Sequence, residues 1–246
     1  MKNNFSMDFL YIAGTGKNFG SGHYKRGKII IELLRNNGYK CDLVENQAAD
    51  DNTYFNYKTI LLDKRDDSFP KSVKNKKKKQ FLVTLDNRGS GRSEADLFID
   101  TLPHIHMNQN EIAQSLKHCI LPPQITREIC RSKFAKITLI NDAQLRILDN
   151  NVFIHRPHSA NMHPDKTNDE EFRLALIKND IVATYFGQTL FEAIYLGKQI
   201  YLYSISPYHS QLAEKFLSVC DKEQLQDLDG KGAERVAALI IKASIG

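Results

Sequence analysis

The residues best suited to chemistry lie in and just after one glycine-rich segment, residues 14–22. An apolar run, residues 9–13, precedes this segment, and a helical pattern, residues 29–34, follows it. In an α/β protein, the succession of strand, glycine-rich turn and helix brings backbone N–H groups up to an anionic ligand. His23 stands at the end of the turn, and an imidazole can take a proton from water or a hydroxyl near neutral pH. The pattern therefore predicts that His23 is a catalytic residue.

Three further residues of this segment are predicted to bind substrate: Gly20, Gly22 and Arg26. The glycines let a ligand approach the backbone closely. Arg26 lies three residues after His23 on the same face of the expected helix, and a guanidinium can hold a phosphate group through two hydrogen bonds. A simpler interpretation stays open for each residue. In the simpler interpretation, His23 caps the helix or makes a passive hydrogen bond to the ligand, and Arg26 forms a surface ion pair.

The glycine spacing argues against two common nucleotide-binding motifs. Three residues separate Gly16 from Gly20, where the dinucleotide-binding fingerprint has two. A Walker loop needs Ser or Thr after its Gly-Lys pair, but Asn18 follows Lys17. We therefore expect no cofactor.

A second strand–turn–helix pattern occupies residues 181–197. We expect the strand to end at Gly187 and the helix to begin there, with its first N–H groups available to a phosphate. One helical turn further on, Glu192 is placed to accept hydrogen bonds from both hydroxyls of a ribose. The predicted binding residues of this half are Gly187, Gln188, Thr189, Glu192 and Gln211. The alternative is an ordinary βαβ unit in which Glu192 is solvated.

Composition and charge narrow the class of protein and its partners. The chain has 246 residues, of which 41% are hydrophobic and 26% charged, as in a folded globular protein. Its formal net charge is +5, which is too small to predict binding to nucleic acid. No apolar run approaches the ~20 residues of a membrane span, and no signal peptide is expected. These features predict a cytoplasmic protein.

Neither a metal site nor a disulfide framework is predicted. The four cysteines are far apart and include no Cys-x-x-Cys pair, which suits a reducing compartment. The histidines at positions 104, 106, 155, 158 and 163 follow no spacing typical of zinc sites. We therefore expect chemistry that needs no metal ion.

Apolar runs alternate with helical patterns along nearly the whole chain, which predicts α/β architecture with parallel sheets. The expected strands are residues 9–13, 41–45, 59–62, 81–85, 97–99, 136–140, 152–154, 181–185 and 199–203. Helices are expected at residues 142–148, 169–177, 189–196, 210–219 and 232–242. Pro122 and Pro123 interrupt the alternation. We predict two Rossmann-like domains, residues 1–121 and 122–246, with a cleft between them.

Two motifs resemble those of a known family. Residues 20–26 read Gly-Ser-Gly-His-x-x-Arg, and residues 185–197 read Tyr-Phe-Gly-Gln-Thr-Leu-Phe-Glu-Ala-x-x-Leu-Gly. In these motifs the chain resembles the nucleotide-sugar hydrolases of the pseudaminic-acid pathway and the related spore-coat polysaccharide biosynthesis proteins. That group shares the two-domain glycosyltransferase-B fold with the MurG-type glycosyltransferases, so the resemblance implies this fold here.

The resemblance also implies an activity. It is that of a metal-independent hydrolase of a nucleotide-activated sugar, UDP-linked in the simplest case, in surface polysaccharide or nonulosonic acid biosynthesis. His23 would help water attack the anomeric carbon, while Gly22 and Arg26 would support the sugar diphosphate. Glu192 would hold the uridine ribose, and Thr189 with the amides after Gly187 would meet the diphosphate.

Two alternative functions stay open. A glycosyltransferase of the same fold would use a UDP-sugar donor with a hydroxyl acceptor in place of water. The lysine-rich residues 74–79 would then lie on an anionic membrane surface. The other alternative is a nucleotide-sugar-binding protein without catalysis, because residues 137–142 lack the Gly-Gly-Ser-Asp turn usual in the family.

Overall fold

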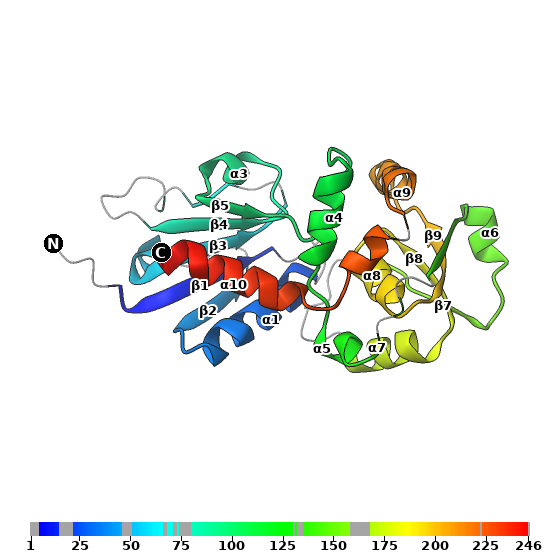
Figure 1. Cartoon of the computed structure of the whole chain (residues 1–246), viewed down its shortest axis with the longest axis horizontal. Coiled ribbons are helices and arrows are strands. Elements are labelled where there is room, and N and C mark those ends of the chain that lie inside the picture. The colour runs from blue at the N-terminus through cyan, green and yellow to red at the C-terminus, as the bar shows by residue number, and fades with distance from the viewer. Residues whose placement is uncertain are drawn as a thin grey trace. The chain divides into compact units, whose positions relative to one another are not determined.

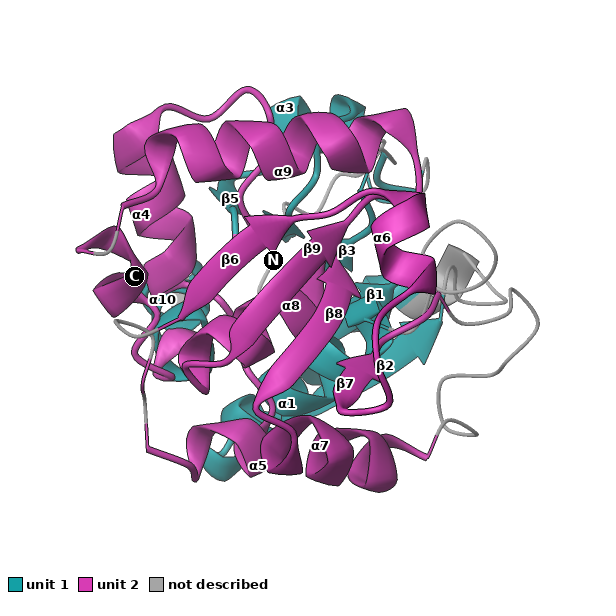
Figure 2. Cartoon of the chain, turned by 90° about the vertical axis from the view of Figure 1, so that its right-hand side faces the viewer, with its two compact units in different colours: residues 1–100, 159–166, 233–246 teal, residues 101–158, 167–232 magenta. Residues whose placement is uncertain are grey.

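The computed structural model describes residues 5–14, 22–45, 51–65, 68–70, 73, 80–129, 131, 135–157, 168–221 and 223–245. The chain forms two compact units, which Figure 2 shows in different colours. Unit 1 comprises residues 1–100, 159–166 and 233–246, and unit 2 comprises residues 101–158 and 167–232. Each unit is built around one parallel sheet, which confirms the predicted α/β class and the parallel strands.

Unit 1 contains a five-stranded parallel sheet in the order β2-β1-β3-β4-β5 (Figure 1). Its strands are β1 (Met7–Ala13), β2 (Cys41–Glu45), β3 (Tyr57–Asp63), β4 (Phe81–Leu85) and β5 (Leu97–Ile99), with the 3₁₀ helix η1 (Asp51–Asn56) before β3. The inner strands β1 and β3 are buried along most of their length, which explains their near-continuous apolar sequences.

The strand order of unit 1 creates a topological switch point. From β1 the chain crosses to β2 at one edge of the sheet, whereas from β3 it continues through β4 to β5 at the other edge. The connections that leave the carboxyl ends of β1 and β3 therefore diverge. In open α/β sheets, ligands bind in the crevice that such a divergence leaves.

The helices of unit 1 are α1 (Gly22–Asn36), α3 (Ser90–Glu94) and α10 (Gly232–Ile245), which runs alongside the strands (Figure 1). Helix α1 lies close against β1 and β2. A Cβ atom on Gly27 would come within 2.8 Å of Cε1 of Tyr11 and 3.0 Å of Cδ1 of Leu43. This close approach fixes the first turns of α1 beside the carboxyl end of β1.

Unit 2 contains a four-stranded parallel sheet in the order β6-β9-β8-β7, whose arrows all point the same way in Figure 2. Its strands are β6 (Lys136–Leu139), β7 (Val152–Ile154), β8 (Ile181–Tyr185) and β9 (Gln199–Tyr203). Its helices are α4 (Gln109–Lys117), α5 (Pro123–Thr126), α6 (Asp142–Arg146), α7 (Asp169–Lys178), α8 (Gln188–Tyr195), α9 (Pro207–Val219) and the 3₁₀ helix η4 (Gln224–Asp227).

Helix α8 forms the centre of the unit 2 core. All its residues from Thr189 to Tyr195 are buried. Phe191 packs edge-on against Phe186 and Phe216, with ring centroids 5.6 and 5.7 Å apart. Such aromatic pairs add to the stabilisation that comes from buried area. The start of α8 is therefore held by a well-packed core.

Among the described residues, two segments group differently from the predicted domains. Residues 101–121 group with unit 2, because Ile112 and Leu116 of α4 belong to its apolar core. Residues 233–246, which include most of α10, group with unit 1. Pro123 is the first residue of α5, where the missing N–H of proline costs nothing, so the proline pair begins a helix within unit 2.

Among the described residues, every helix is too short or too polar to cross a membrane.

Candidate functional site

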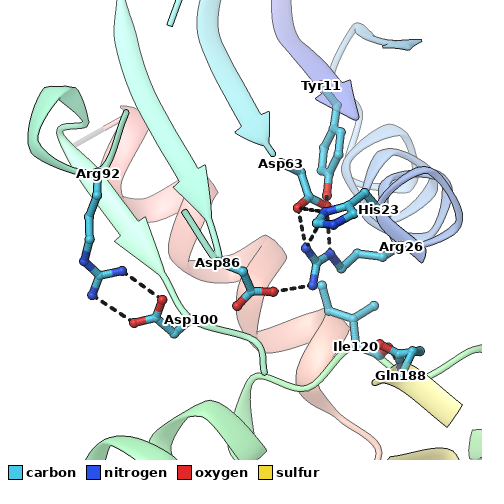
Figure 3. A network of polar contacts seen from close by, with 9 residues as sticks. All are labelled: Tyr11, His23, Arg26, Asp63, Asp86, Arg92, Asp100, Ile120 and Gln188. Atoms are coloured by element: carbon cyan, nitrogen blue, oxygen red, sulfur yellow. Dashed lines mark hydrogen bonds and ion pairs between the residues drawn. The ribbon is translucent and has the colours of Figure 1, made fainter. Parts of the chain in front are cut away.

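Five polar side chains meet at the switch point of unit 1 (Figure 3). Tyr11 comes from β1, Asp63 is the last residue of β3, and Asp86 follows β4 directly. His23 and Arg26 come from the first two turns of α1. We call these five residues the His23 cluster. It brings together the two titratable residues that the sequence analysis singled out in this half.

The carboxylate of Asp63 is the centre of the His23 cluster. Its Oδ1 lies 2.6 Å from Nδ1 of His23 and also accepts a hydrogen bond from Nη2 of Arg26. Its Oδ2 accepts from the hydroxyl of Tyr11 at 2.6 Å and from Nε of Arg26 at 2.7 Å. Asp63 is 0% exposed, so these four contacts replace its hydration.

The cluster keeps Asp63 ionised. Burial by itself raises the pKa of the Asp63 carboxyl, but the charge of Arg26, followed by the interaction with His23, outweighs burial. The pKa of Asp63 therefore lies well below its usual range. Burial, and then the negative charge of Asp63, raise the pKa of the Tyr11 phenol well above its usual value. Tyr11 is accordingly a permanent hydrogen-bond donor to this carboxylate.

Arg26 is the counter-ion of two carboxylates. It is 5% exposed, and besides its two contacts with Asp63 it donates from Nη1 to Oδ2 of Asp86 at 2.5 Å. Burial lowers the pKa of a guanidinium, but Asp63 and then Asp86 raise the pKa of Arg26 well above its usual value. This arrangement differs from a surface ion pair, and the predicted contact of Arg26 with a phosphate stays a prediction.

Asp86 has an unusual backbone conformation. Among the described residues it is the one non-glycine residue with a positive φ, 49°. Aspartate tolerates this left-handed region better than most residues. Two backbone contacts hold the strand-end loops: the Asp86 N–H donates to Ile99 O at 3.0 Å, and the Asn87 side chain donates to Lys64 O at 2.8 Å. They place the Asp86 carboxylate on Arg26.

Of the two predicted glycines of this half, the structure describes Gly22, and Gly20 lies outside the described residues. Gly22 is the first residue of α1, and a Cβ atom there would meet no atom of the described residues within 4 Å. Gly27, by contrast, could carry a Cβ only by displacing Tyr11. Among the described residues, therefore, nothing packs against Gly22.

In unit 2, the start of α8 holds three of the predicted binding residues. Gly187 precedes the helix with an extended backbone, φ 167°, and the nearest atom to a Cβ there would be Cε2 of Tyr185 at 3.8 Å. Gln188 donates from Nε2 to Ile120 O at 2.7 Å, which anchors α8 to the segment after α4. Thr189 is buried. Their contacts with a diphosphate stay predictions.

Glu192 is buried, which shows that the solvated alternative is wrong. It is 1% exposed, and its Oε1 lies 3.4 Å from Nη2 of Arg173 on α7. Arg173 also lies 3.5 Å from Asp169 Oδ2. A buried carboxylate needs such a partner. Gln211 is exposed on α9. The contacts of Glu192 and Gln211 with a nucleoside stay predictions.

Sequence reasoning missed Asp63, Tyr11 and Arg173. A signal for Asp63 exists, because this acidic residue directly ends a buried run at the carboxyl end of a parallel strand. Tyr11 carries no comparable signal, since a tyrosine in an apolar strand is most simply a core residue. Arg173 contacts Glu192 across 19 positions, which no local pattern reveals.

The described ranges contain no group of three or more His, Cys, Asp or Glu side chains placed to hold a metal ion. Comparisons with protein-family models, with curated proteins and with solved structures found no match. The function proposed for the chain therefore rests on the two sites and on the sequence motifs that form them.

Proposed function

We propose that the protein is a metal-independent hydrolase of a nucleotide-activated sugar, with UDP as the leaving group and His23 as the general base. The position of His23 carries the proposal. The residue lies in the first turn of α1, beside the carboxyl ends of β1 and β3, with its imidazole held against the buried Asp63. An imidazole fixed at the ligand-binding edge of a parallel sheet is suited to take a proton from water.

The proposed reaction displaces UDP from the sugar. The oxygen of a water molecule bonds to the anomeric carbon while the bond from that carbon to the diphosphate oxygen breaks. UDP leaves with the electron pair of the broken bond, and His23 takes one proton from the attacking water. The products are the free sugar and UDP, and His23 returns its proton to solvent.

The start of α1 at Gly22 supports an anionic ligand at the same place. Helix α1 has 15 residues, so its first N–H groups carry partial positive charge. Gly22 has no side chain, and no atom of the described residues would lie within 4 Å of a Cβ there, which suits the approach of a diphosphate to the backbone. The proposal does not depend on a contact between Arg26 and the diphosphate, since Arg26 already pairs with Asp63 and Asp86.

The nucleotide is assigned to unit 2 by the resemblance of residues 185–197. The extended Gly187, the buried Thr189 and the buried Glu192 at the start of α8 support that assignment. The parallel sheet in each unit supports the proposed glycosyltransferase-B fold. A role in surface polysaccharide or nonulosonic acid biosynthesis belongs to the same proposal.

The test is an assay of nucleotide release by the full chain with EDTA present. UDP-GlcNAc, CMP-sialic acid and a GDP-sugar are each incubated with the protein in ¹⁸O-labelled water. The proposal predicts release of UDP and incorporation of ¹⁸O into the sugar, because water attacks the anomeric carbon. ¹⁸O in the UDP would mean attack at phosphorus, and that result would contradict the proposed reaction.

The same assay separates the alternative functions. Release of UDP only when a sugar hydroxyl acceptor is added would identify a glycosyltransferase. Stabilisation by UDP without release from any donor would identify a binding protein. Either result would overturn the hydrolase.

A further inference from the structure

We infer that Asp63 is the positioning residue of this site, which fixes the tautomer of His23 so that Nε2 is the atom that takes the proton from water. The part of this inference that concerns proton transfer from water rests on the proposed function. Its structural basis is the set of contacts around the imidazole, which are independent of any substrate.

The contacts of His23 Nδ1 identify the tautomer. Nδ1 lies 2.6 Å from Oδ1 of Asp63 and 3.1 Å from Nη2 of Arg26. An ionised carboxylate only accepts hydrogen bonds, and a guanidinium only donates them. Nδ1 therefore either donates to Asp63 or accepts from Arg26, and the shorter contact favours donation to the carboxylate. His23 and Arg26 then both donate to Oδ1, and the lone pair of the neutral imidazole is on Nε2.

The carboxylate that sets this tautomer cannot turn freely. Arg26 binds both of its oxygens, through Nη2 to Oδ1 and through Nε to Oδ2. Tyr11 adds a further donor on Oδ2. Rotation of the Asp63 side chain would break all of these contacts inside the protein, where lost hydrogen bonds are not replaced by water. The orientation of His23 is therefore determined before a substrate binds.

The net charge of the cluster favours the transfer of a proton to His23. Asp63 and Asp86 carry two negative charges and Arg26 carries one positive charge, so these three side chains sum to one negative charge. When His23 takes a proton, its positive charge forms 2.6 Å from an oxygen of Asp63. Fixed negative charge therefore faces the charge that develops in the transition state.

The first test is the substitution Asp63→Asn. An asparagine keeps the size of the side chain but presents an N–H₂ donor that can face Nδ1, which favours the wrong tautomer. For a residue that acts through the general base, we expect kcat to fall by about 10²–10⁴-fold with little change in KM. A kcat close to that of the wild type would overturn the inference.

The control substitution is Asp100→Asn in the same unit. Asp100 accepts two hydrogen bonds from Arg92, at 2.8 and 2.9 Å, so this variant also breaks a bidentate Arg–Asp pair (Figure 3). Asp100 has no part in the His23 cluster, and its variant should keep the wild-type kcat. An equal loss of kcat in both variants would show that general damage to unit 1 explains the effect.

The double variant His23→Ala/Asp63→Asn separates positioning from other roles. If Asp63 acts through His23, adding Asp63→Asn to His23→Ala should lower kcat by little more than His23→Ala alone. If the two losses multiply, Asp63 acts independently of His23, and the inference is wrong.

A measurement on the wild-type protein keeps the inference testable even if Asp63→Asn fails to fold. Ring ¹⁵N shifts of labelled histidines, followed through a pH series until the His23 ring is neutral, report the tautomer. We expect His23 to carry its proton on Nδ1, and a proton on Nε2 would overturn the inference whatever the activity. An Nδ1 proton in a protein that hydrolyses no nucleotide sugar would uphold the tautomer and contradict the proposed function instead.

Discussion

Both units bury an arginine against carboxylates, but they hold it differently. In unit 1, Arg26 donates to Oδ2 of Asp63 at 2.7 Å and to Oδ2 of Asp86 at 2.5 Å, with a further contact to Asp63. In unit 2, Arg173 lies 3.4 Å from Glu192 and 3.5 Å from Asp169. The first distances are those of charge-assisted hydrogen bonds, whereas the second are long for hydrogen bonds.

This difference suggests a division of labour between the units. Short contacts to both oxygens of Asp63 fix a carboxylate whose orientation must not change during a reaction. The longer contact between Arg173 and Glu192 can be exchanged for hydrogen bonds to a ligand at a lower cost. The comparison therefore favours a catalytic group in unit 1 and a binding carboxylate in unit 2.

The largest expected effect is on stability. Arg26→Met would leave Asp63 and Asp86 buried without their counter-ion, and we expect a loss of about 3–5 kcal/mol in the free energy of unfolding. Arg173→Met should cost less, about 1–3 kcal/mol, because its contacts are longer and the Asp169 side chain is 37% exposed. Urea unfolding of both variants measures the two losses. Equal losses would remove the proposed difference between the units.

The second prediction concerns nucleotide binding in unit 2. UDP at 100 times its dissociation constant should stabilise the wild type by about 2.7 kcal/mol. Glu192→Gln should lose most of this stabilisation, measured against its own melting temperature without ligand. Glu214→Gln on the exposed side of α9 is the control and should respond to UDP like the wild type. An undiminished response of the Glu192 variant would exclude Glu192 from the nucleotide site.

A third prediction follows from the lowered pKa of Asp63. In the unfolded chain the pKa of Asp63 is near its reference value of 3.8, and in the folded protein it is lower. Below about pH 3.8, therefore, Asp63 binds a proton in the unfolded chain but stays ionised in the folded protein. The stabilisation from Asp63 is therefore fully present above about pH 4 and is lost as the pH falls further. The stability difference between wild type and Asp63→Asn should narrow below pH 4 in urea unfolding. A constant difference down to pH 2.5 would contradict the depressed pKa.

The smallest expected effects concern two glycines of α1, Gly27 and Gly22. Gly27→Ala should destabilise the protein by about 1–3 kcal/mol, because its Cβ would overlap the ring of Tyr11. Gly22→Ala should change stability by less than about 1 kcal/mol, since its Cβ would meet no atom of the described residues within 4 Å. In the hydrolysis assay, Gly22→Ala should nevertheless raise KM. An unchanged KM would show that no ligand approaches Gly22.

Much of the fold could be predicted from the sequence. Six strands have the predicted bounds: residues 41–45, 81–85, 97–99, 152–154, 181–185 and 199–203. These strands are short apolar runs, and local pattern is enough to find them. The helix α4 was not predicted, although Asn108 and Glu111 form a capping box that marks its start. Its place in the unit 2 core depends on long-range packing.

The candidate site was predictable only in part. His23 and Arg26 share a helix face, and this local spacing predicted that they would act together. Their common partner Asp63 lies 40 and 37 residues away, and only the strand order brings it to them. Sequence pattern therefore identified the imidazole that we propose as the general base, but not the carboxylate that contacts it.

The most direct test of the proposed hydrolase compares UDP release by the wild type and by His23→Ala. The substrate is a UDP-sugar from which the wild type releases UDP. The matched control is Glu32→Ala on the exposed face of the same helix. We expect His23→Ala to lower kcat by about 10²–10⁴-fold while UDP binding persists, and Glu32→Ala to match the wild type. An unchanged kcat in His23→Ala would contradict the assignment of His23 as the general base.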